Sequence, residues 1–272
     1  MKVFPIPEFL IVTAVSLLLC AIGFKRFVWF MSVGYGVSSA GIGLTLLILS
    51  IVNKSIGLGY AMQCILFVIY GVRLGGFLLI RELKNASYKS KLDEIGANAK
   101  PPIFVSLFMW LFCGVLYVCQ AAGLFYRFTN GYSTSYDVLG YVGIIISIIG
   151  IIIEATADKQ KSAQKKTNPN MPAMQGLFKL CRCPNYFGEI LFWTGCFVSG
   201  IKVFAGLQWI IAIIGYCAIV FIMLSGAKRL EKRHIKNYGD KKEYNDYADH
   251  TPILIPFVPI YHVVKASEVE KK

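Results

Sequence analysis

The chain has 272 residues, of which 56% are hydrophobic and 16% are charged, and its mean hydropathy is +0.59. Soluble domains carry about 25% charged residues, so this composition argues against a soluble globular protein. The formal net charge of +13 suits anionic lipid headgroups or an anionic ligand. We expect no nucleic acid partner, because aromatic residues are not interleaved with a soluble basic surface.

Long apolar stretches divide the chain, and most contain about 18 residues or more, the length that a helix needs to cross about 30 Å of hydrocarbon. The sequence therefore predicts an all-α polytopic membrane protein, with one domain over residues 1–272. In chain order, the seven predicted spans are 6–24, 27–51, 57–80, 102–126, 138–157, 189–204 and 206–226. The first stretch is interpreted as a retained helix and not as a signal peptide, because no small-residue cleavage site precedes Lys25.

The orientation follows from the distribution of the 28 Lys and Arg residues. With seven spans, most of them fall on the side of the C-terminus, in loops 81–101 and 158–188 and in the tail from residue 227. Basic loops stay in the cytoplasm, so the sequence predicts an N-out, C-in topology with the active site facing the cytoplasm. The bacterial inner membrane and the endoplasmic reticulum both remain open.

The eight cysteines do not predict a disulfide framework. Six lie within predicted spans, where cysteine behaves as a small hydrophobic residue. Cys181 and Cys183 form a CxC pair on the reducing cytoplasmic side, without nearby histidines or further cysteines. We therefore expect no metal site.

Two polar residues lie inside the third predicted span. Arg73 could extend its side chain toward the interface, or it could serve a ligand, because Gly71, Gly75 and Gly76 allow close approach to the backbone. Tyr70 lies one turn earlier on nearly the same face. It could be a packed aromatic residue or a proton donor to a carbonyl oxygen.

The richest polar stretch runs from residue 154 to residue 189. Asn185 and Glu189 share a face of the helix that begins at Pro184. Glu189 could simply complement the helix dipole, but with Asp158 and Asn185 it forms a set that suits a carboxamide and ribose hydroxyls. Basic residues that suit phosphates accompany this set: Lys165, Lys166, Lys179, Arg182, Lys228, Arg229, Lys232 and Arg233. The chain has neither a Rossmann glycine pattern nor a P-loop.

These motifs resemble the steroid 5α-reductase superfamily of membrane reductases. The stretch Gly176-Leu-Phe…Arg182-Cys-Pro-Asn-Tyr-Phe-Gly-Glu189 is similar to its Gly-Leu-(Phe/Trp)…Arg-His-Pro-Asn-Tyr-Phe-Gly-Glu signature. Asp158-x-Gln160 resembles its acidic-Gln element, and Tyr244-x-x-Tyr247 followed by Ile-Pro-Phe resembles its C-terminal pattern. The resemblance covers about residues 65–260.

The resemblance implies NADPH as cofactor and hydride transfer to the β-carbon of an enone, typically the Δ4 bond of a 3-oxo-steroid. Tyr70 resembles the tyrosine that polarises the substrate carbonyl. The residues that would bind the cofactor are Arg73, Asp158, Lys165, Arg182, Asn185, Tyr186, Glu189, Arg229, Tyr244 and Tyr247. We expect a monomer in the lipid bilayer, with a cavity among the spans for a steroid or isoprenoid-like substrate and with loop 158–188 and the tail as its cytoplasmic cap.

Two departures and two alternatives accompany this resemblance. Cys183 replaces the usual histidine, and the second span lacks the glutamate that steroid-reducing members pair with their tyrosine; a sterol, polyprenoid or acyl enone therefore stays open as substrate. A membrane methyltransferase using S-adenosylmethionine has a related Arg-His-Pro element, but Asp158, Gln160 and Asn185 together favour the reductase. A non-catalytic sterol or lipid binder is the second alternative.

Overall fold

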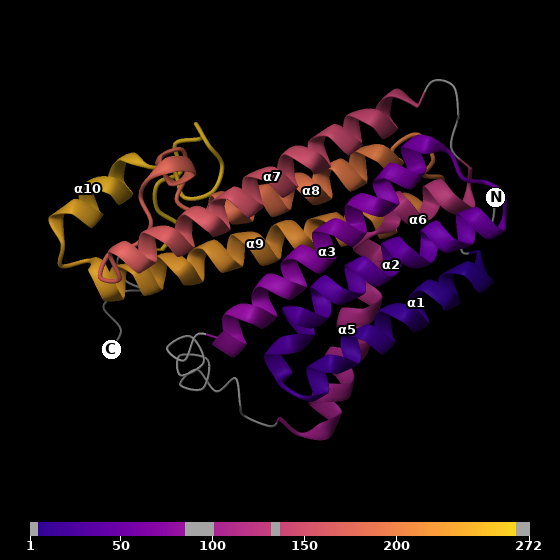
Figure 1. Cartoon of the computed structure of the whole chain (residues 1–272), viewed down its shortest axis with the longest axis horizontal. Helices are drawn as coiled ribbons and strands as arrows, with labels where there is room; N and C mark the ends of the chain where they lie inside the picture. Colours follow the sequence, from indigo (N-terminus) through magenta and orange to yellow (C-terminus); the bar gives the residue numbers. More distant parts are fainter. Residues whose placement is uncertain (1–4, 85–100, 132–136, 265–272) are drawn as a thin grey trace. The chain divides into compact units, whose positions relative to one another are not determined.

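The computed structural model describes residues 5–84, 101–131 and 137–264, and every regular element in that part is a helix. Within these described residues, six helices are long and apolar enough to cross a membrane. They are labelled in Figure 1: α1 (Ile6–Cys20, continued by a 3₁₀ turn to Phe24), α2 (Val33–Val52, preceded by the 3₁₀ turn Phe27–Met31), α3 (Leu58–Lys84), α5 (Ile103–Gln120), α7 (Val138–Thr167) and α9 (Gln208–Tyr238).

The remaining helices are shorter. The helix α8 (Pro184–Gly200) has 17 residues and is about 26 Å long, slightly less than a typical span. The other short elements are α6 (Ala122–Thr129), η3 (Gly176–Lys179) and α10 (Lys242–His250). The all-helical prediction is confirmed for the described residues, while the seventh span and the orientation stay predictions.

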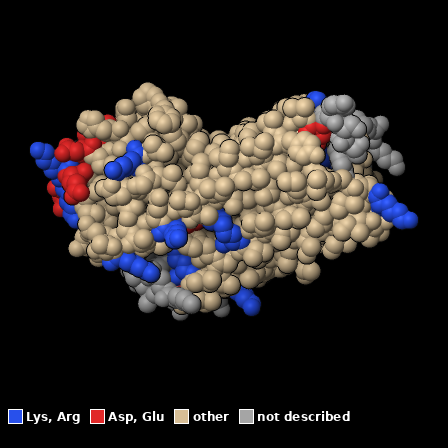
Figure 2. Space-filling view, turned by 45° about the horizontal axis from the view of Figure 1, so that its top comes forward, with Lys and Arg blue, Asp and Glu red and all other residues tan. Residues whose placement is uncertain are grey.

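Large apolar side chains cover the outside of the long helices. Leu18, Val72, Phe108 and Phe221 are each more than 60% exposed, and the face drawn in Figure 2 has wide areas without charge. On that face, acidic and basic side chains are intermixed at the end where α10 lies. Contiguous exposed apolar surface on helices of this length is typical of an integral membrane protein.

Several predicted boundaries are wrong. The predicted span 102–126 is two helices, because α5 ends at Gln120 and α6 begins at Ala122. The predicted loop 158–188 is helical as far as Thr167, and α9 continues twelve residues beyond Gly226. Apolar content stops at these points, but Lys, Gln, Ala and Glu are good helix formers and continue the helix into the polar region. Most of the predicted loop 81–101 lies outside the described residues.

The chain divides into two compact units, which we describe separately. The first comprises residues 1–144 and 195–216, and its densest contact is between α2 and α3. A Cβ atom on Gly36 would lie 2.6 Å from the amide nitrogen of Gly75, and one on Gly71 would lie 2.5 Å from that of Ala40. The two helix backbones therefore touch, which only small residues allow.

Replacing Gly71 with alanine should destabilise the first unit by about 1–3 kcal/mol, because the added methyl group meets backbone atoms of α2 that cannot rotate away. Gly76→Ala is the matched control on the same helix, because a Cβ there meets nothing within 4 Å. The control should be neutral or slightly stabilising. Thermal unfolding in detergent compares the two variants, and equal melting temperatures would contradict the packing described here.

The second unit comprises residues 145–194 and 217–272. Within it α7 lies alongside α8: the Ser147 hydroxyl donates to the Phe192 carbonyl (3.1 Å), and a Cβ on Gly188 would lie 2.7 Å from the Glu154 nitrogen. A Cβ on Gly226 of α9 would lie 3.3 Å from the ring of Tyr186 on α8. Three helices thus form the scaffold on which the loop 168–183 and the tail are packed.

Candidate functional site

The antiparallel contact of α7 and α8 arranges the predicted polar set. Ser147 meets Phe192, and Glu154 meets Gly188, so one further turn of α7 brings Asp158 toward the start of α8 at Pro184 and Asn185. Asp158 and Glu189 are both buried. Two buried carboxyl groups and the Asn185 amide therefore belong to one region of the second unit, and their role in binding a ligand stays a prediction.

Basic side chains from three parts of the second unit approach this region. Lys161 and Lys165 of α7, Arg182 before α8 and Arg233 of α9 all interact electrostatically with the His234 side chain of α9. Near the Tyr186 hydroxyl the charged groups are Glu189, Arg229 and Arg233. Arg182 is already paired with Glu231, but positive charges that converge from separate elements still raise the local positive potential. This arrangement suits a phosphate-bearing ligand.

The chemistry of the donor set fits a dinucleotide. The Oδ1 atom of Asn185 is buried without a hydrogen-bond partner in the described structure, which is costly unless a ligand or water supplies a donor. Carboxylates and amides accept hydrogen bonds from ribose hydroxyls and a carboxamide, while Lys and Arg bind phosphates. The second unit holds all three kinds of group.

Arg182, predicted to bind phosphate, lies in a buried ion pair. It is 3% exposed, and its Nη2 atom donates to Oε1 of Glu231 (2.9 Å) and to the Tyr261 carbonyl. The Glu231 carboxylate also accepts from the amides of Val263 (2.8 Å) and Val264 (3.0 Å). His262 bridges Glu231 (3.0 Å) and Asp249 (2.9 Å). The pair fastens the tail to α9, and a role of Arg182 toward a ligand stays a prediction.

Lys165 and two glutamines fix the loop that follows α7. The Lys165 ammonium donates to the carbonyls of Pro169 (2.9 Å) and Met171 (2.7 Å) and to the Tyr238 hydroxyl (2.7 Å). Gln164 accepts from the amides of residues 174 and 175, and Gln160 accepts from residue 177. The Gln of the Asp-x-Gln element therefore positions the Gly-Leu-Phe turn, while the predicted cofactor role of Lys165 remains untested.

The predicted tail tyrosines belong to the same unit. Tyr247 donates to the Phe178 carbonyl (2.6 Å), and Tyr244 packs with Met171 and Ala248 in a buried cluster. Burial raises the pKa of both phenols, so both stay neutral at physiological pH. They join α10 to the loop 168–183, and their contact with a cofactor stays a prediction.

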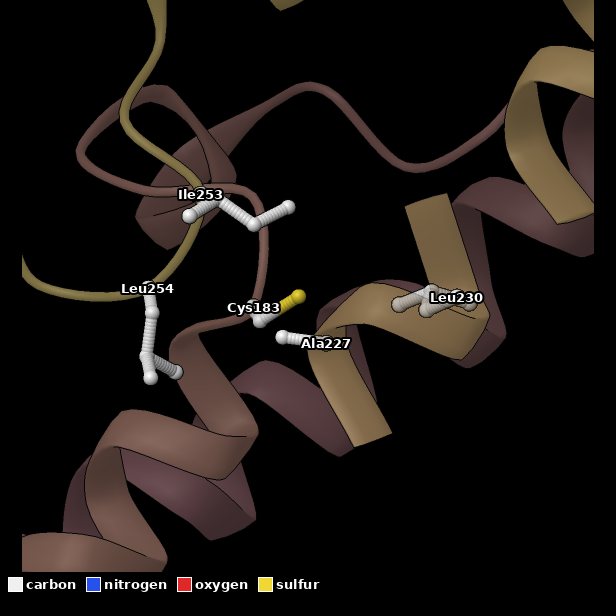
Figure 3. Close-up of a cluster of buried hydrophobic side chains, with 5 residues drawn as sticks. All are labelled: Cys183, Ala227, Leu230, Ile253 and Leu254. Atoms are coloured by element: carbon white, nitrogen blue, oxygen red, sulfur yellow. The ribbon is translucent and has the colours of Figure 1, made fainter. Parts of the chain in front are cut away.

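Cys183 lies in an apolar cluster with Ala227, Leu230, Ile253 and Leu254 (Figure 3). Its side chain points toward α9, where Ala227 and Leu230 lie. Burial raises the pKa of the Cys183 thiol to about 12 and that of Cys181 to about 11. The residue that replaces the usual histidine is therefore a small packing group, and a histidine here would need a hydrogen-bond partner that these neighbours do not supply.

Both CxC thiols should resist alkylation in the folded protein. With a pKa of about 12 against an ordinary 9.0, the thiolate fraction of Cys183 is about 1,000-fold lower than that of an exposed thiol. Mass spectrometry after N-ethylmaleimide treatment at neutral pH should find Cys181 and Cys183 unmodified, and modified once the protein is denatured. Rapid modification of Cys183 in the folded protein would show that its apolar cluster is open, and rapid modification of Cys181 would show that this thiol is not buried.

In the first unit, Tyr70 lies on α3 and its hydroxyl is 2.8 Å from that of Tyr35 on α2. Both side chains are buried. Arg73 lies one turn further along α3 and is partly exposed. The predicted set is thus divided, with Tyr70 and Arg73 in the first unit and the other predicted residues in the second.

Sequence reasoning missed Glu231, Lys161 and Tyr35. Glu231 interrupts a basic run, Lys228-Arg229-Leu230-Glu231-Lys232-Arg233, and a single acid among cations on a helix is a signal for a buried ion pair. Lys161 lies four residues before Lys165 and so on the same face of α7. Tyr35 has no signal beyond being a polar residue within an apolar span.

Comparisons with known proteins agree with the resemblance of the motifs. The model of a family described as "Protein of unknown function (DUF1295)" matches residues 25–251. "Steroid 5-alpha-reductase DET2" of Gossypium hirsutum is 27% identical over 119 residues, which are 43% of this chain and 41% of that protein. "Steroid 5-alpha-reductase DET2" of Arabidopsis thaliana is 29% identical over 123 residues, with shares of 43% and 41%. The similarity thus spans about two fifths of the length of these relatives. No solved structure matches the chain.

Proposed function

Because this chain belongs to the DUF1295 family and to the steroid 5α-reductase superfamily, we propose that it reduces the C=C bond of an apolar enone with NADPH. The Δ4 bond of a 3-oxo-steroid is the substrate that this proposal favours, since both similar proteins carry the name steroid 5-alpha-reductase. The proposal includes seven spans, with α8 as the short sixth one, an N-out, C-in topology, a cytoplasmic cofactor site and a monomer.

The observation that carries the proposal is the polar set of the second unit. Buried Asp158 and Glu189 and the buried Asn185 oxygen occur in one unit with basic side chains that interact electrostatically with His234 and Tyr186. A reduced dinucleotide needs both kinds of contact, whereas S-adenosylmethionine has no phosphate for the basic groups. The set therefore favours NADPH over the methyltransferase cofactor.

In this reaction the protein would bind the cofactor, orient the substrate against it and polarise the substrate carbonyl. NADPH, when bound, supplies the hydride that adds to the β-carbon of the enone, and a proton from water would add at the α-carbon to complete the reduction. Asp158, Asn185 and Glu189 would hold the nicotinamide ribose end, and Lys161, Arg229 and Arg233 would hold the phosphates. Tyr70 would donate a hydrogen bond to the enone oxygen, where negative charge develops; one such preorganised donor contributes about 10²–10³-fold to a rate.

The test is NADPH oxidation by the detergent-purified chain with and without progesterone, a 3-oxo-Δ4 steroid. Progesterone-dependent loss of the reduced-nicotinamide absorbance supports cofactor, reaction and substrate class together. If the protein binds NADPH but does not turn over progesterone, the reductase assignment stands and the substrate belongs to another class of enone. Binding of S-adenosylmethionine without binding of NADPH would overturn the proposal.

A further inference from the structure

Two buried tyrosines meet in the first unit, one from each of two adjacent helices. The hydroxyl oxygens of Tyr35 and Tyr70 are 2.8 Å apart, and the two rings pack edge to face with centroids 6.2 Å apart. Tyr35 is 6% exposed and Tyr70 is fully buried. A hydroxyl pair at this distance shares a hydrogen bond of ordinary length.

The contact between the helix backbones fixes this pair. Gly36 directly follows Tyr35, Gly71 directly follows Tyr70, and these two glycines lie where α2 and α3 touch. The backbone beside each tyrosine therefore cannot shift without separating the helices, and the Ser39 hydroxyl donates to the Tyr35 carbonyl (2.9 Å). The hydroxyl pair is held by rigid elements, as a preorganised site requires.

A third tyrosine packs against the pair. The ring of Tyr117 on α5 is 5.1 Å from that of Tyr35, but its hydroxyl donates to the Phe30 carbonyl (2.6 Å). Tyr117 is a matched control, because it has the same side chain and lies next to the same partner.

We propose that Tyr35 is a positioning residue that acts through Tyr70. The inference rests on the proposed function, in which Tyr70 polarises the enone oxygen. The pair has two hydroxyl protons and the shared hydrogen bond uses one, so the direction of that bond decides which phenol donates outward. When Tyr35 donates to the Tyr70 oxygen, the Tyr70 O–H is directed to the substrate.

The same bond would support the developing charge. As negative charge grows on the substrate oxygen, the Tyr70 proton is drawn toward it and the Tyr70 oxygen becomes more negative. The Tyr35 O–H then strengthens its hydrogen bond to that oxygen, and no proton leaves either phenol. Because α2 contains no Asp or Glu, the support that α2 gives to Tyr70 would come from a neutral hydroxyl and not from a carboxylate.

A double-mutant cycle on the full chain tests the inference, with NADPH and progesterone as probes. Tyr70→Phe should lower kcat about 100-fold, and Tyr35→Phe should lower kcat about tenfold with KM and NADPH affinity unchanged. In the Tyr70→Phe background, Tyr35→Phe should change kcat less than about twofold, because its effect passes through the missing hydroxyl. Tyr117→Phe should leave kcat unchanged.

The possible failures are distinguishable. Wild-type protein that neither binds NADPH nor oxidises it with progesterone sinks the proposed function, and this inference with it. If the wild type is active, an unchanged kcat in Tyr35→Phe overturns the inference alone. A further tenfold loss from Tyr35→Phe in the Tyr70→Phe background also overturns it, because Tyr35 then acts independently. NADPH titration by fluorescence and thermal unfolding check that each variant is folded.

Discussion

Replacing Glu231 with alanine should lower the free energy of unfolding by about 3–5 kcal/mol, the usual cost of removing one partner of a buried ion pair. Glu231 is 1% exposed and Arg182 is 3% exposed, so the guanidinium would keep a buried charge without its carboxylate. The amides of Val263 and Val264 would lose their acceptor as well. Chemical unfolding of the detergent-solubilised protein measures the loss.

Amide hydrogen exchange reports the same change locally. In the wild type, residues 263 and 264 should exchange slowly, because both amides donate to the buried carboxylate; in Glu231→Ala they should exchange at the rate of an unstructured segment. Glu243→Ala on α10 is the control, since Glu243 is also an acid but is exposed. Slow exchange in both variants would mean that the tail is held by its apolar contacts alone.

A second comparison separates the charge from the packing. Replacing Arg182 and Glu231 together with methionine removes both charges and should recover part of the lost stability, because a buried ion pair exchanged for apolar side chains is often neutral. The recovery should be incomplete, since the two tail amides still lack their acceptor. If the double variant is less stable than Glu231→Ala, the remaining Arg182 charge is not the cause of the loss.

The helices were predictable from sequence because apolar length is a local property. The spans near α1, α2, α3 and α7 begin within a few residues of the predicted positions, as expected where hydrophobic runs alone decide the fold. The ends of α7 and α9 were not predictable in this way, because their last turns are polar and give no hydropathy signal. Helix propensity was the available signal there, and the residues 158–167 contain mainly Lys, Gln, Ala and Ser.

In the candidate site, too, contacts within one helix were predictable, whereas contacts between residues far apart in the sequence were not. Asn185 and Glu189 share one helix, so their common face follows from spacing alone. The partner of Arg182 lies 49 residues away, and charge by itself does not say which of many opposite charges it meets. The Tyr35–Tyr70 pair depends on the relative position of two apolar helices, which their glycines permit but do not specify.

Replacing Glu189 with alanine should weaken NADPH binding more than about 100-fold while leaving the fold intact. A hydrogen bond to a charged group contributes about 1.5–3 kcal/mol, and Glu189 would supply such bonds to the ribose end of the cofactor from the second turn of α8. Fluorescence titration with NADPH measures the affinity. Normal binding by Glu189→Ala would show that the cofactor residues are assigned wrongly.

Two matched variants identify the cause of the loss. Tyr70→Phe should bind NADPH as the wild type does and lose turnover, because its hydroxyl serves the substrate and not the cofactor. Glu243→Ala removes an exposed acid from α10 and should change neither quantity, which controls for the protein's net charge. A loss of affinity in Glu189→Ala together with an unchanged melting temperature assigns the effect to the contact with NADPH, since a damaged helix α8 would lower both.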